Sequence, residues 1–378
     1  MRDVEHEFEN LNITRGYPGK IYLLRADELN GCNFDCLVLI PNEINNLARI
    51  ALSCRNKSSP GRNYVDNPIP SVDSYKFLGV YENVEKEKAI LVYPYLTQYA
   101  RGPYYQQLTR EALLDKTSGY ERVDNQIVSA IKAIKEKLLR EDNIHTEEKI
   151  DVFGFSAAGT FAQRFTALHY DIVRACCTGG AMDGVPLPVV ELAGERLEYP
   201  LEIADFKELT GRDYNREEHK KVVYFNWYGA KESDVPLMRN GELVRDKDGR
   251  IISNYDMVYI RNCTPPDEAE KILRLIGRTP QDRFRRTSEI YLREGFDYRT
   301  KIYQDIGHTN THETVIDCQQ FYSSISNEHS KQEIGTSTML EKLEIEQEGL
   351  IDDLSIKETS LTQIDDKSSE VSNTDEIL

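Results

Sequence analysis

Short apolar runs alternate with helix-like stretches along most of the chain. The runs are rich in β-branched and aromatic residues, which is typical of buried strands. They cover residues 20–25, 36–40, 89–93, 150–153, 172–177, 221–228 and 298–303. Strands that alternate with helices form parallel sheets with helices on their faces. The pattern therefore predicts an α/β protein with a doubly wound, mostly parallel sheet, whose site lies at the carboxyl ends of the strands.

The clearest helix covers residues 121–140. One apolar stripe recurs there at spacings of three or four residues, formed by Val123, Ile127, Ile131, Ile134 and Leu138. This spacing is typical of an amphipathic helix. We expect the helix to cover the sheet just before the strand at 150–153 and to carry no chemistry.

A serine follows that strand on what reads as a sharp turn. In DVFGFSAAGTF, residues 151–161, Ser156 lies between Gly154 and Ala158, and helix-like residues follow at once. This is the layout of a nucleophile elbow, in which the residues two before and two after the serine must be small because the strand and helix backbones nearly touch. Alanine replaces the usual second glycine and is still small. Taken alone, the segment fits equally well a turn whose serine only caps the helix.

An elbow of this kind predicts an acid after a later strand and a histidine after the last strand. The run 221–228 leads into the acidic loop 230–236, and the run 298–303 leads to His308. A histidine that follows a glycine is more often an ordinary loop residue. This one comes last in the order serine, acid, histidine, just beyond a strand end, so we interpret it as catalytic.

With these features the chain resembles the α/β-hydrolase superfamily, and is most similar to an esterase branch related to polyhydroxybutyrate depolymerases. The resemblance spans roughly residues 15–325 and is carried by GFSAAGTFAQRFTALHYDIVRACCTGG, YGAKESD and DIGHT. It implies that Ser156 is the nucleophile, His308 the general base and then acid, and Asp234 the carboxylate that orients the histidine. In many relatives the acid lies three residues after the glycine that ends the strand. That position is Glu232 here, so Glu232 is the alternative acid.

Acyl transfer also needs donors for the negative oxygen that forms when the serine attacks. We expect the first donor to be the backbone N–H of Ala157, next to the nucleophile. In this fold the second donor comes from the loop after the third strand. If residues 36–40 are that strand, the donor lies in residues 41–44, and Asn42 is our candidate.

Two insertions are expected to build the substrate pocket. Residues 182–220 lie between the strand after the elbow and the strand before the acid, where this fold often carries a cap over the serine. Residues 237–297 separate the acid from the histidine. A third, tyrosine-rich segment, residues 93–105, either lines an acyl or aromatic pocket or covers a loop edge. Its Arg101 either holds a substrate carboxylate or, more simply, pairs with a neighbouring acid.

Negative charge is concentrated at the end of the chain. The formal net charge is −17, and residues 326–378 hold 14 acidic residues against 4 basic ones, with no Phe, Trp, Tyr or Cys. Such a segment lacks the apolar mass that would offset its ordering entropy. We therefore expect a catalytic domain over residues 1–325 and a disordered acidic tail over residues 326–378. No basic cluster of the kind that binds nucleic acid is visible.

Signals for targeting and for metal binding are weak. The start, MRDVEHEFENLN, has no basic segment followed by an apolar one, and no apolar run has the length of a membrane span. The seven cysteines lack zinc-ligand spacing and fit free thiols in a cytoplasmic protein. We expect a cytoplasmic protein with no membrane span, no metal and no organic cofactor. The oligomeric state is left open.

Two functional hypotheses follow. The first is a serine hydrolase that cleaves a carboxylic ester or related acyl bond of a small molecule through an acyl-enzyme intermediate. Esterases, thioesterases, lipases, depolymerases and peptidases share these catalytic atoms, so the sequence does not choose among them. The second is a non-catalytic protein of the same fold that binds a ligand or partner. A distance between Ser156 and His308 well beyond about 2.6–3.2 Å would favour the second.

Overall fold

The computed structural model describes residues 19–54, 88–96, 105–181, 186–232, 238–239, 242–245, 249, 251 and 266–331. The chain divides into two units, Met1–Ser324 and Ile325–Leu378. All elements described below belong to the first unit, except that the last helix, α12 (His312–Lys331), continues into the second. The acidic tail expected from residue 326 lies outside the described residues beyond Lys331.

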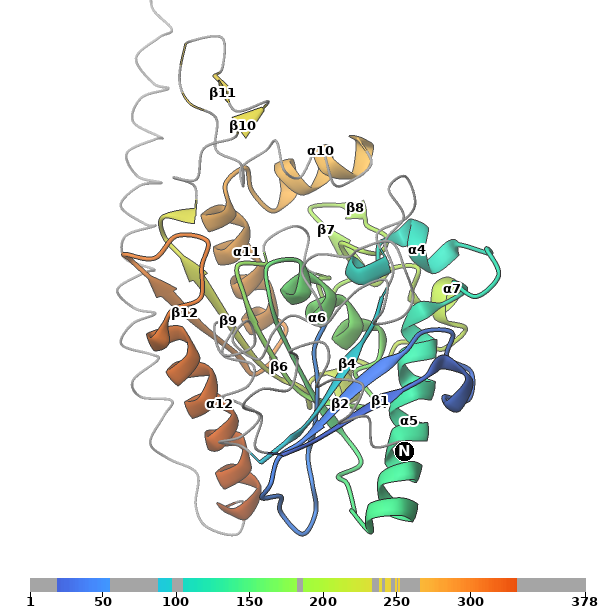
Figure 1. Cartoon of the computed structure of the whole chain (residues 1–378). Coiled ribbons are helices and arrows are strands. Elements are labelled where there is room, and N and C mark those ends of the chain that lie inside the picture. The colour runs from blue at the N-terminus through green and yellow to red at the C-terminus, as the bar shows by residue number, and fades with distance from the viewer. Residues whose placement is uncertain are drawn as a thin grey trace, which may run out of the picture. The chain divides into compact units, whose positions relative to one another are not determined.

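An eight-stranded sheet forms the centre of the first unit (Figure 1), in the order β1-β2-β4-β3-β5-β6-β9-β12. Its strands are β1 (Lys20–Leu24), β2 (Cys36–Ile40), β3 (Ile50–Leu52), β4 (Ile90–Pro94), β5 (Ile150–Phe155), β6 (Val173–Gly179), β9 (Val223–Gly229) and β12 (Tyr298–Tyr303). Strand β2 is antiparallel to both of its neighbours, and all other neighbouring pairs are parallel. The predicted doubly wound, mostly parallel sheet is confirmed.

All seven apolar runs of the sequence form strands of this sheet. The strand that the pattern missed is β3, which has only three residues, Ile50–Leu52. All three are buried, because β3 lies in the middle of the sheet between β4 and β5. A segment so short shows no periodicity that separates it from its surroundings, yet it changes which strand is the third in the chain.

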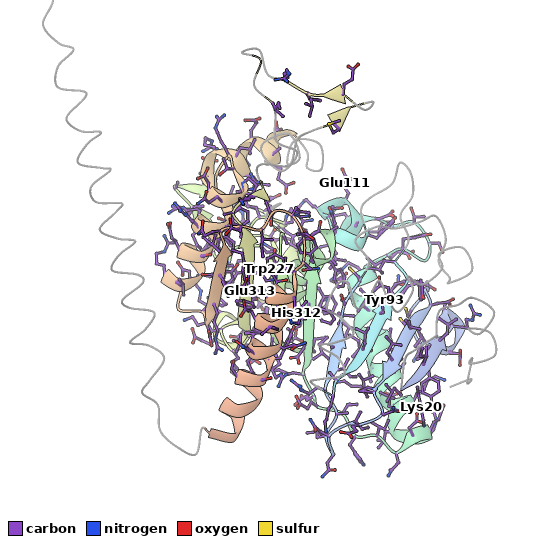
Figure 2. All side chains as sticks on the ribbon, turned by 60° about the vertical axis from the view of Figure 1, so that its left-hand side comes forward. Lys20, Tyr93, Glu111, Trp227, His312 and Glu313 are labelled. Atoms are coloured by element: carbon purple, nitrogen blue, oxygen red, sulfur yellow. The ribbon has the colours of Figure 1, made fainter. Side chains whose placement is uncertain are left out.

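Helices flank this sheet on both sides (Figure 1). Helix α5 (Val123–Asp142) matches the helix expected at 121–140, and its predicted apolar stripe is buried. Helix α6 (Ala157–Leu168) follows β5 directly, and every one of its residues is buried. Figure 2 shows side chains filling the space between sheet and helices, with Trp227 inside and Lys20 and Glu111 on the surface.

The remaining helices and strands complete the description. They are the 3₁₀ helices η1 (Ala26–Glu28) and η2 (Tyr105–Gln107), the helices α4 (Arg110–Leu114), α7 (Phe206–Thr210), α8 (Arg216–His219), α10 (Pro266–Leu275) and α11 (Pro280–Arg293), and the hairpins β7 (Glu191–Leu192) with β8 (Glu195–Arg196) and β10 (Met238–Arg239) with β11 (Glu242–Leu243). Among the described residues, no helix has the length and apolar character needed to cross a membrane.

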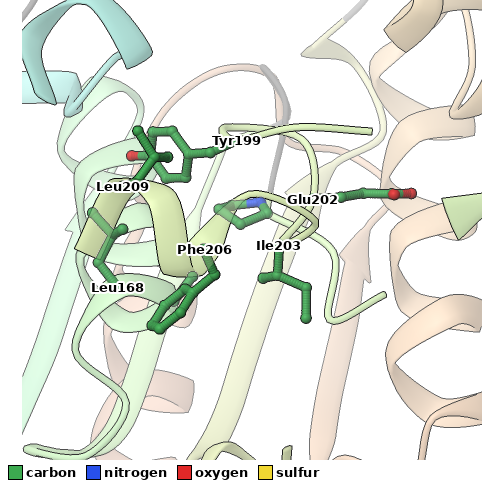
Figure 3. A pocket seen from close by; sticks show the side chains of 8 residues that line it. Leu168, Tyr199, Glu202, Ile203, Phe206 and Leu209 are labelled. Atoms are coloured by element: carbon green, nitrogen blue, oxygen red, sulfur yellow. The ribbon is translucent and has the colours of Figure 1, made fainter. Parts of the chain in front are cut away.

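The described part of the first insertion, residues 186–220, packs on the carboxyl end of α6. A small apolar cavity lies between them (Figure 3), lined by Ala167, Leu168, Pro186, Tyr199, Glu202, Ile203, Phe206 and Leu209. Ala167 and Leu168 end the helix that begins after Ser156, about 17 Å away along the helix axis at 1.5 Å per residue. These contacts are therefore with the end of α6 away from the serine, and the cap over the serine remains a prediction.

Glu202, which lines this cavity, is a buried carboxyl group. It is 0% exposed, and neither of its oxygens makes a well-formed hydrogen bond within the described part of the chain. Burial raises its pKa from 4.5 to about 8, the charge of Glu191 adds to this rise, and the nearby backbone N–H of Leu197 only partly offsets it. At neutral pH this carboxyl group is thus protonated in the folded protein and ionised in the unfolded chain.

We expect Glu202→Gln to remove a pH-dependent loss of stability. Between pH 4.5 and about 8 only the unfolded chain releases this proton, so rising pH destabilises the wild-type fold by up to about 1.4 kcal/mol per pH unit. Glutamine has no such proton. Urea unfolding across this range should show the free energy of unfolding shifting steadily in favour of the variant. Glu208→Gln, at an exposed position in the same insertion, is the matched control. A wild-type-to-variant difference that does not change with pH would contradict the assignment.

Candidate active site

Ser156 lies on a strained turn between β5 and α6. Its backbone has φ 59° and ψ −127°, a conformation that residues with a side chain rarely adopt. The turn is held from both sides, because the N–H of Ser156 donates to the carbonyl of Gly179 at 2.9 Å and its own carbonyl accepts from the N–H of Thr160 at 3.0 Å. Strain of this kind persists where the surrounding structure imposes it, and it is common at catalytic residues.

The small residues around Ser156 are there for the steric reason that the sequence suggested. A Cβ atom added to Gly154 would lie 2.2 Å from the backbone oxygen of Ala158, so any larger residue would separate the strand from the helix. The hydroxyl of Ser156 makes no capping bond to α6. The local geometry is that of a nucleophile elbow and not of a helix cap.

His308 reaches Ser156 from the loop after β12. Its Nε2 lies 2.8 Å from Oγ of Ser156. The imidazole packs against the ring of Phe155 at 4.8 Å between centroids, and Phe155 stacks in turn on Trp227 at 5.3 Å. On the adjacent loop, Gly180 has φ 59°, and a Cβ added there would lie 3.0 Å from Cε1 of His308. The histidine is therefore confined by rings and backbone as well as by its hydrogen bonds.

Glu232 is the carboxylate that the structure brings to His308. Its Oε2 lies 3.2 Å from Nδ1 of the imidazole, and its Oε1 accepts a hydrogen bond from the N–H of Gly229 at 3.3 Å. The side chain of Glu232 is 2% exposed and that of His308 is 10% exposed, so water screens this contact little. Asp234, the acid favoured by the sequence, lies outside the described residues, as do its neighbours from 233 to 237.

Backbone hydrogen bonds join the loop of Glu232 to the loop of His308. The N–H of Ala230 donates to the carbonyl of Tyr303 at 2.9 Å, and the N–H of Lys231 donates to the carbonyl of Ile306, also at 2.9 Å. Because β9 and β12 are parallel neighbours, both loops leave the same edge of the sheet. The acid and the histidine are thus held in register by the main chain.

Ala157, the first oxyanion donor that the sequence predicted, begins helix α6, and its role stays a prediction. It is the first residue of α6 and directly follows the serine. The first N–H groups of a helix have no partner within the helix and carry partial positive charge, which suits them to a developing oxyanion.

Asn42 is not placed to act as the second donor, and this prediction was wrong. Strand β2, which precedes it, is antiparallel to β4, with Cys36 opposite Pro94 and Leu39 opposite Leu91. Asn42 therefore lies at the amino ends of the parallel strands, at the opposite edge of the sheet from Ser156.

The error arose from treating residues 36–40 as the third strand. The third strand is β3, whose following loop begins with the buried residues Ser53 and Cys54. Residues 55–87 of that loop lie outside the described residues. The same holds for Arg101 and most of its tyrosine-rich segment, from residue 97 to residue 104. Among the residues that are described, no group of three or more His, Cys, Asp or Glu side chains could hold a metal ion.

The sheet and the loops together define the class of fold. A mostly parallel sheet with this strand order and one antiparallel second strand, a serine on an elbow after the fifth strand and a histidine after the eighth, is an α/β-hydrolase fold. The fold implied by the sequence resemblance is therefore confirmed.

The chain is similar to several solved structures at low sequence identity. No family model matches the chain, and no curated protein matches it. A poly(aspartic acid) hydrolase-1 from Sphingomonas sp. KT-1 is 15% identical, over 76% of this chain and 92% of that chain, with a TM-score of 0.48. A poly(3-hydroxybutyrate) depolymerase from Bordetella parapertussis is 12% identical, over 80% and 89%, also with a TM-score of 0.48. A siderophore hydrolase from Aspergillus nidulans is 10% identical, over 81% and 94%, with a TM-score of 0.43.

Proposed function

We propose that this protein is a serine hydrolase that cleaves a carboxylic ester or related acyl bond through an acyl-enzyme intermediate, with Ser156, His308 and Glu232 as its triad. One observation carries the proposal, a continuous chain of contacts from Oγ of Ser156 to Nε2 of His308 at 2.8 Å and from Nδ1 to Oε2 of Glu232 at 3.2 Å. Serine is a weak nucleophile unless an adjacent base takes its proton, and this arrangement supplies the base and its orienting acid.

The reaction follows from these atoms. As Oγ of Ser156 attacks the acyl carbon, Nε2 of His308 takes the serine proton, and Glu232 stabilises the imidazolium that forms. The N–H of Ala157 donates to the oxyanion. His308 then gives its proton to the leaving alkoxide, which departs as the alcohol half of the ester and leaves the acyl group on Oγ of Ser156. A water molecule attacks this acyl group as His308 takes its proton. The bond from Oγ to the acyl carbon breaks, His308 returns the proton to Oγ, and the carboxylic acid leaves.

The assignment of Glu232 reverses the order of preference between the two acids. Its contact with Nδ1 supports this role, and the bond from the N–H of Gly229 fixes its other oxygen. Asp234 stays a competing prediction. For the second oxyanion donor, the position of β3 favours the loop that begins at Ser53.

The alternative, a non-catalytic protein of the same fold, has less support. A separation of Ser156 and His308 beyond hydrogen-bond reach would favour this alternative, and the two residues are in contact at 2.8 Å. A small-molecule ester fits the proposed chemistry as substrate, and the cytoplasmic location stays a prediction.

A fluorophosphonate probe tests the proposed function. The activated Oγ of Ser156 should displace fluoride from phosphorus and form a stable covalent adduct, because the probe mimics the tetrahedral intermediate. We expect the folded protein to be labelled, the label to map to the peptide that contains Ser156, and heat denaturation beforehand to prevent it. Ser156→Ala should not be labelled. A folded wild-type protein that stays unlabelled, or a label on another serine, would overturn the proposal.

A further inference from the structure

Two cysteines that are far apart in the sequence meet between the central sheet and helix α12. Cys177 lies on β6 and Cys318 on α12, and their sulfur atoms are 3.1 Å apart. A disulfide bond is about 2.05 Å long, so a shift of roughly 1 Å would bring the two sulfurs to bonding distance. Both residues are free thiols in this structure. We infer that Cys177 and Cys318 form a reversible disulfide when the protein meets a peroxide, and that this bond joins α12 to the central sheet.

The two thiols differ in access, which sets the order of the chemistry. Cys318 is partly exposed, whereas Cys177 is 3% exposed. Burial and the neighbouring thiol of Cys318 raise the pKa of Cys177 well above its ordinary value. The oxidant therefore meets Cys318 first, and Cys177 is the thiol that resolves the product.

The steps balance with hydrogen peroxide as the oxidant. The thiol of Cys318 loses its proton and its sulfur attacks one peroxide oxygen, so that an S–O bond forms and the O–O bond breaks. The hydroxide that leaves takes up that proton to become the first water, and a sulfenic acid remains on Cys318. The sulfur of Cys177 then attacks the sulfur of Cys318. The S–S bond forms, the S–O bond breaks, and the second water leaves with the proton of Cys177. Two electrons pass from the thiol pair to the peroxide.

The disulfide would connect the strand beside Ser156 to the helix that follows His308. Cys177 pairs in register with Phe153 on β5 and lies two positions before Gly179, whose carbonyl holds the N–H of Ser156. Helix α12 begins at His312, which is labelled with Glu313 in Figure 2, directly after the loop of His308. The bond would thus fix the helix after the histidine to the strand beside the serine. The inferred disulfide does not depend on the proposed hydrolase activity.

Two other cysteines are candidates for the control variant. Cys176 precedes Cys177 but, because side chains alternate along a strand, points to the other face of the sheet. Cys32, also buried at 3% exposed, lies near the carbonyl of Phe34 in a different part of the molecule. Cys32→Ser is therefore the control for Cys318→Ser.

The test is to treat the full chain with hydrogen peroxide, alkylate the remaining thiols under denaturing conditions and map the peptides without reduction. We expect the alkylatable cysteines to fall from seven to five, the intact protein to lose two hydrogen atoms, and the peptides of Cys177 and Cys318 to be recovered as one cross-linked species. Dithiothreitol should restore seven. The cross-link should disappear in Cys318→Ser and persist in Cys32→Ser.

Thermal melting gives a second readout, because a misfolded variant could not reproduce a rise in melting temperature. A bond that closes so long a loop should raise the melting temperature of the oxidised wild type by about 4 °C or more, and this rise should be absent in Cys318→Ser. The inference is overturned if Cys177 and Cys318 are recovered from oxidised wild-type protein as separately alkylated peptides, or if oxidation raises the melting temperature of Cys318→Ser as much as that of the wild type.

Discussion

Replacing Ser156 with alanine is expected to lower kcat for a simple activated ester, such as p-nitrophenyl acetate, by about 10⁴-fold or more. The variant keeps the N–H of Ala157 but has no atom to accept the acyl group. His308→Ala should lose a similar amount, because serine without its base is a weak nucleophile. Release of p-nitrophenol, followed by absorbance, measures both losses.

The double variant Ser156→Ala/His308→Ala sharpens this test. Because the two residues act as a unit, the double variant should be no slower than either single one. If the loss of kcat in the double variant equals the product of the two single losses, the residues act independently. That result would contradict a role based on the 2.8 Å contact between them. Unchanged melting temperatures would show that the fall in kcat does not result from unfolding of the variants.

The second large effect is expected from Glu232→Gln. Glutamine keeps the size of the side chain but carries no negative charge, so the imidazole loses both its fixed tautomer and the stabilisation of its charged form. The loss of kcat in the comparable serine protease variant is about 10⁴-fold, and we expect a loss of this order here. Asp234→Asn, the matched control, should keep most of the wild-type kcat.

The reverse ranking would give the role to Asp234. A large loss in Asp234→Asn with a mild effect in Glu232→Gln would mean that the contact of Glu232 with Nδ1 is structural. Measuring kcat and KM separately distinguishes an orienting acid, which lowers kcat, from a loop residue that mainly changes substrate binding.

The sequence predicted those parts of the site whose requirements are local. At Gly154 and Ala158, the need for small residues follows from how closely a strand and a helix approach, so a short stretch of sequence reveals it. His308 was singled out because the order serine, acid, histidine follows from the parallel sheet, and it lies 2.8 Å from Oγ of Ser156. Most strands were found for a similar reason, since buried strands are continuous apolar runs.

What the sequence missed depends on tertiary pairing. The three residues of β3 form a strand only because β4 and β5 lie on either side of them. Without β3, the direction of β2 was misread and Asn42 was placed at the wrong edge. The choice between Glu232 and Asp234 also depends on side-chain reach, which neighbouring positions in one acidic loop do not reveal, and Asp234 stays a competing prediction.

The wide spacing of the three proposed catalytic residues bears on how the protein is made. His308 follows Ser156 by 152 positions and Glu232 by 76. During synthesis the ribosome therefore releases the proposed nucleophile long before its proposed acid and base. Under the proposed mechanism, a nascent chain that had folded around β5 and α6 would carry an ordinary, unreactive serine, and a truncated translation product ending before β12 would be inactive. Reactivity would then arise only when the last strand adds to the sheet, so that a completed fold and a working nucleophile would be acquired in the same event.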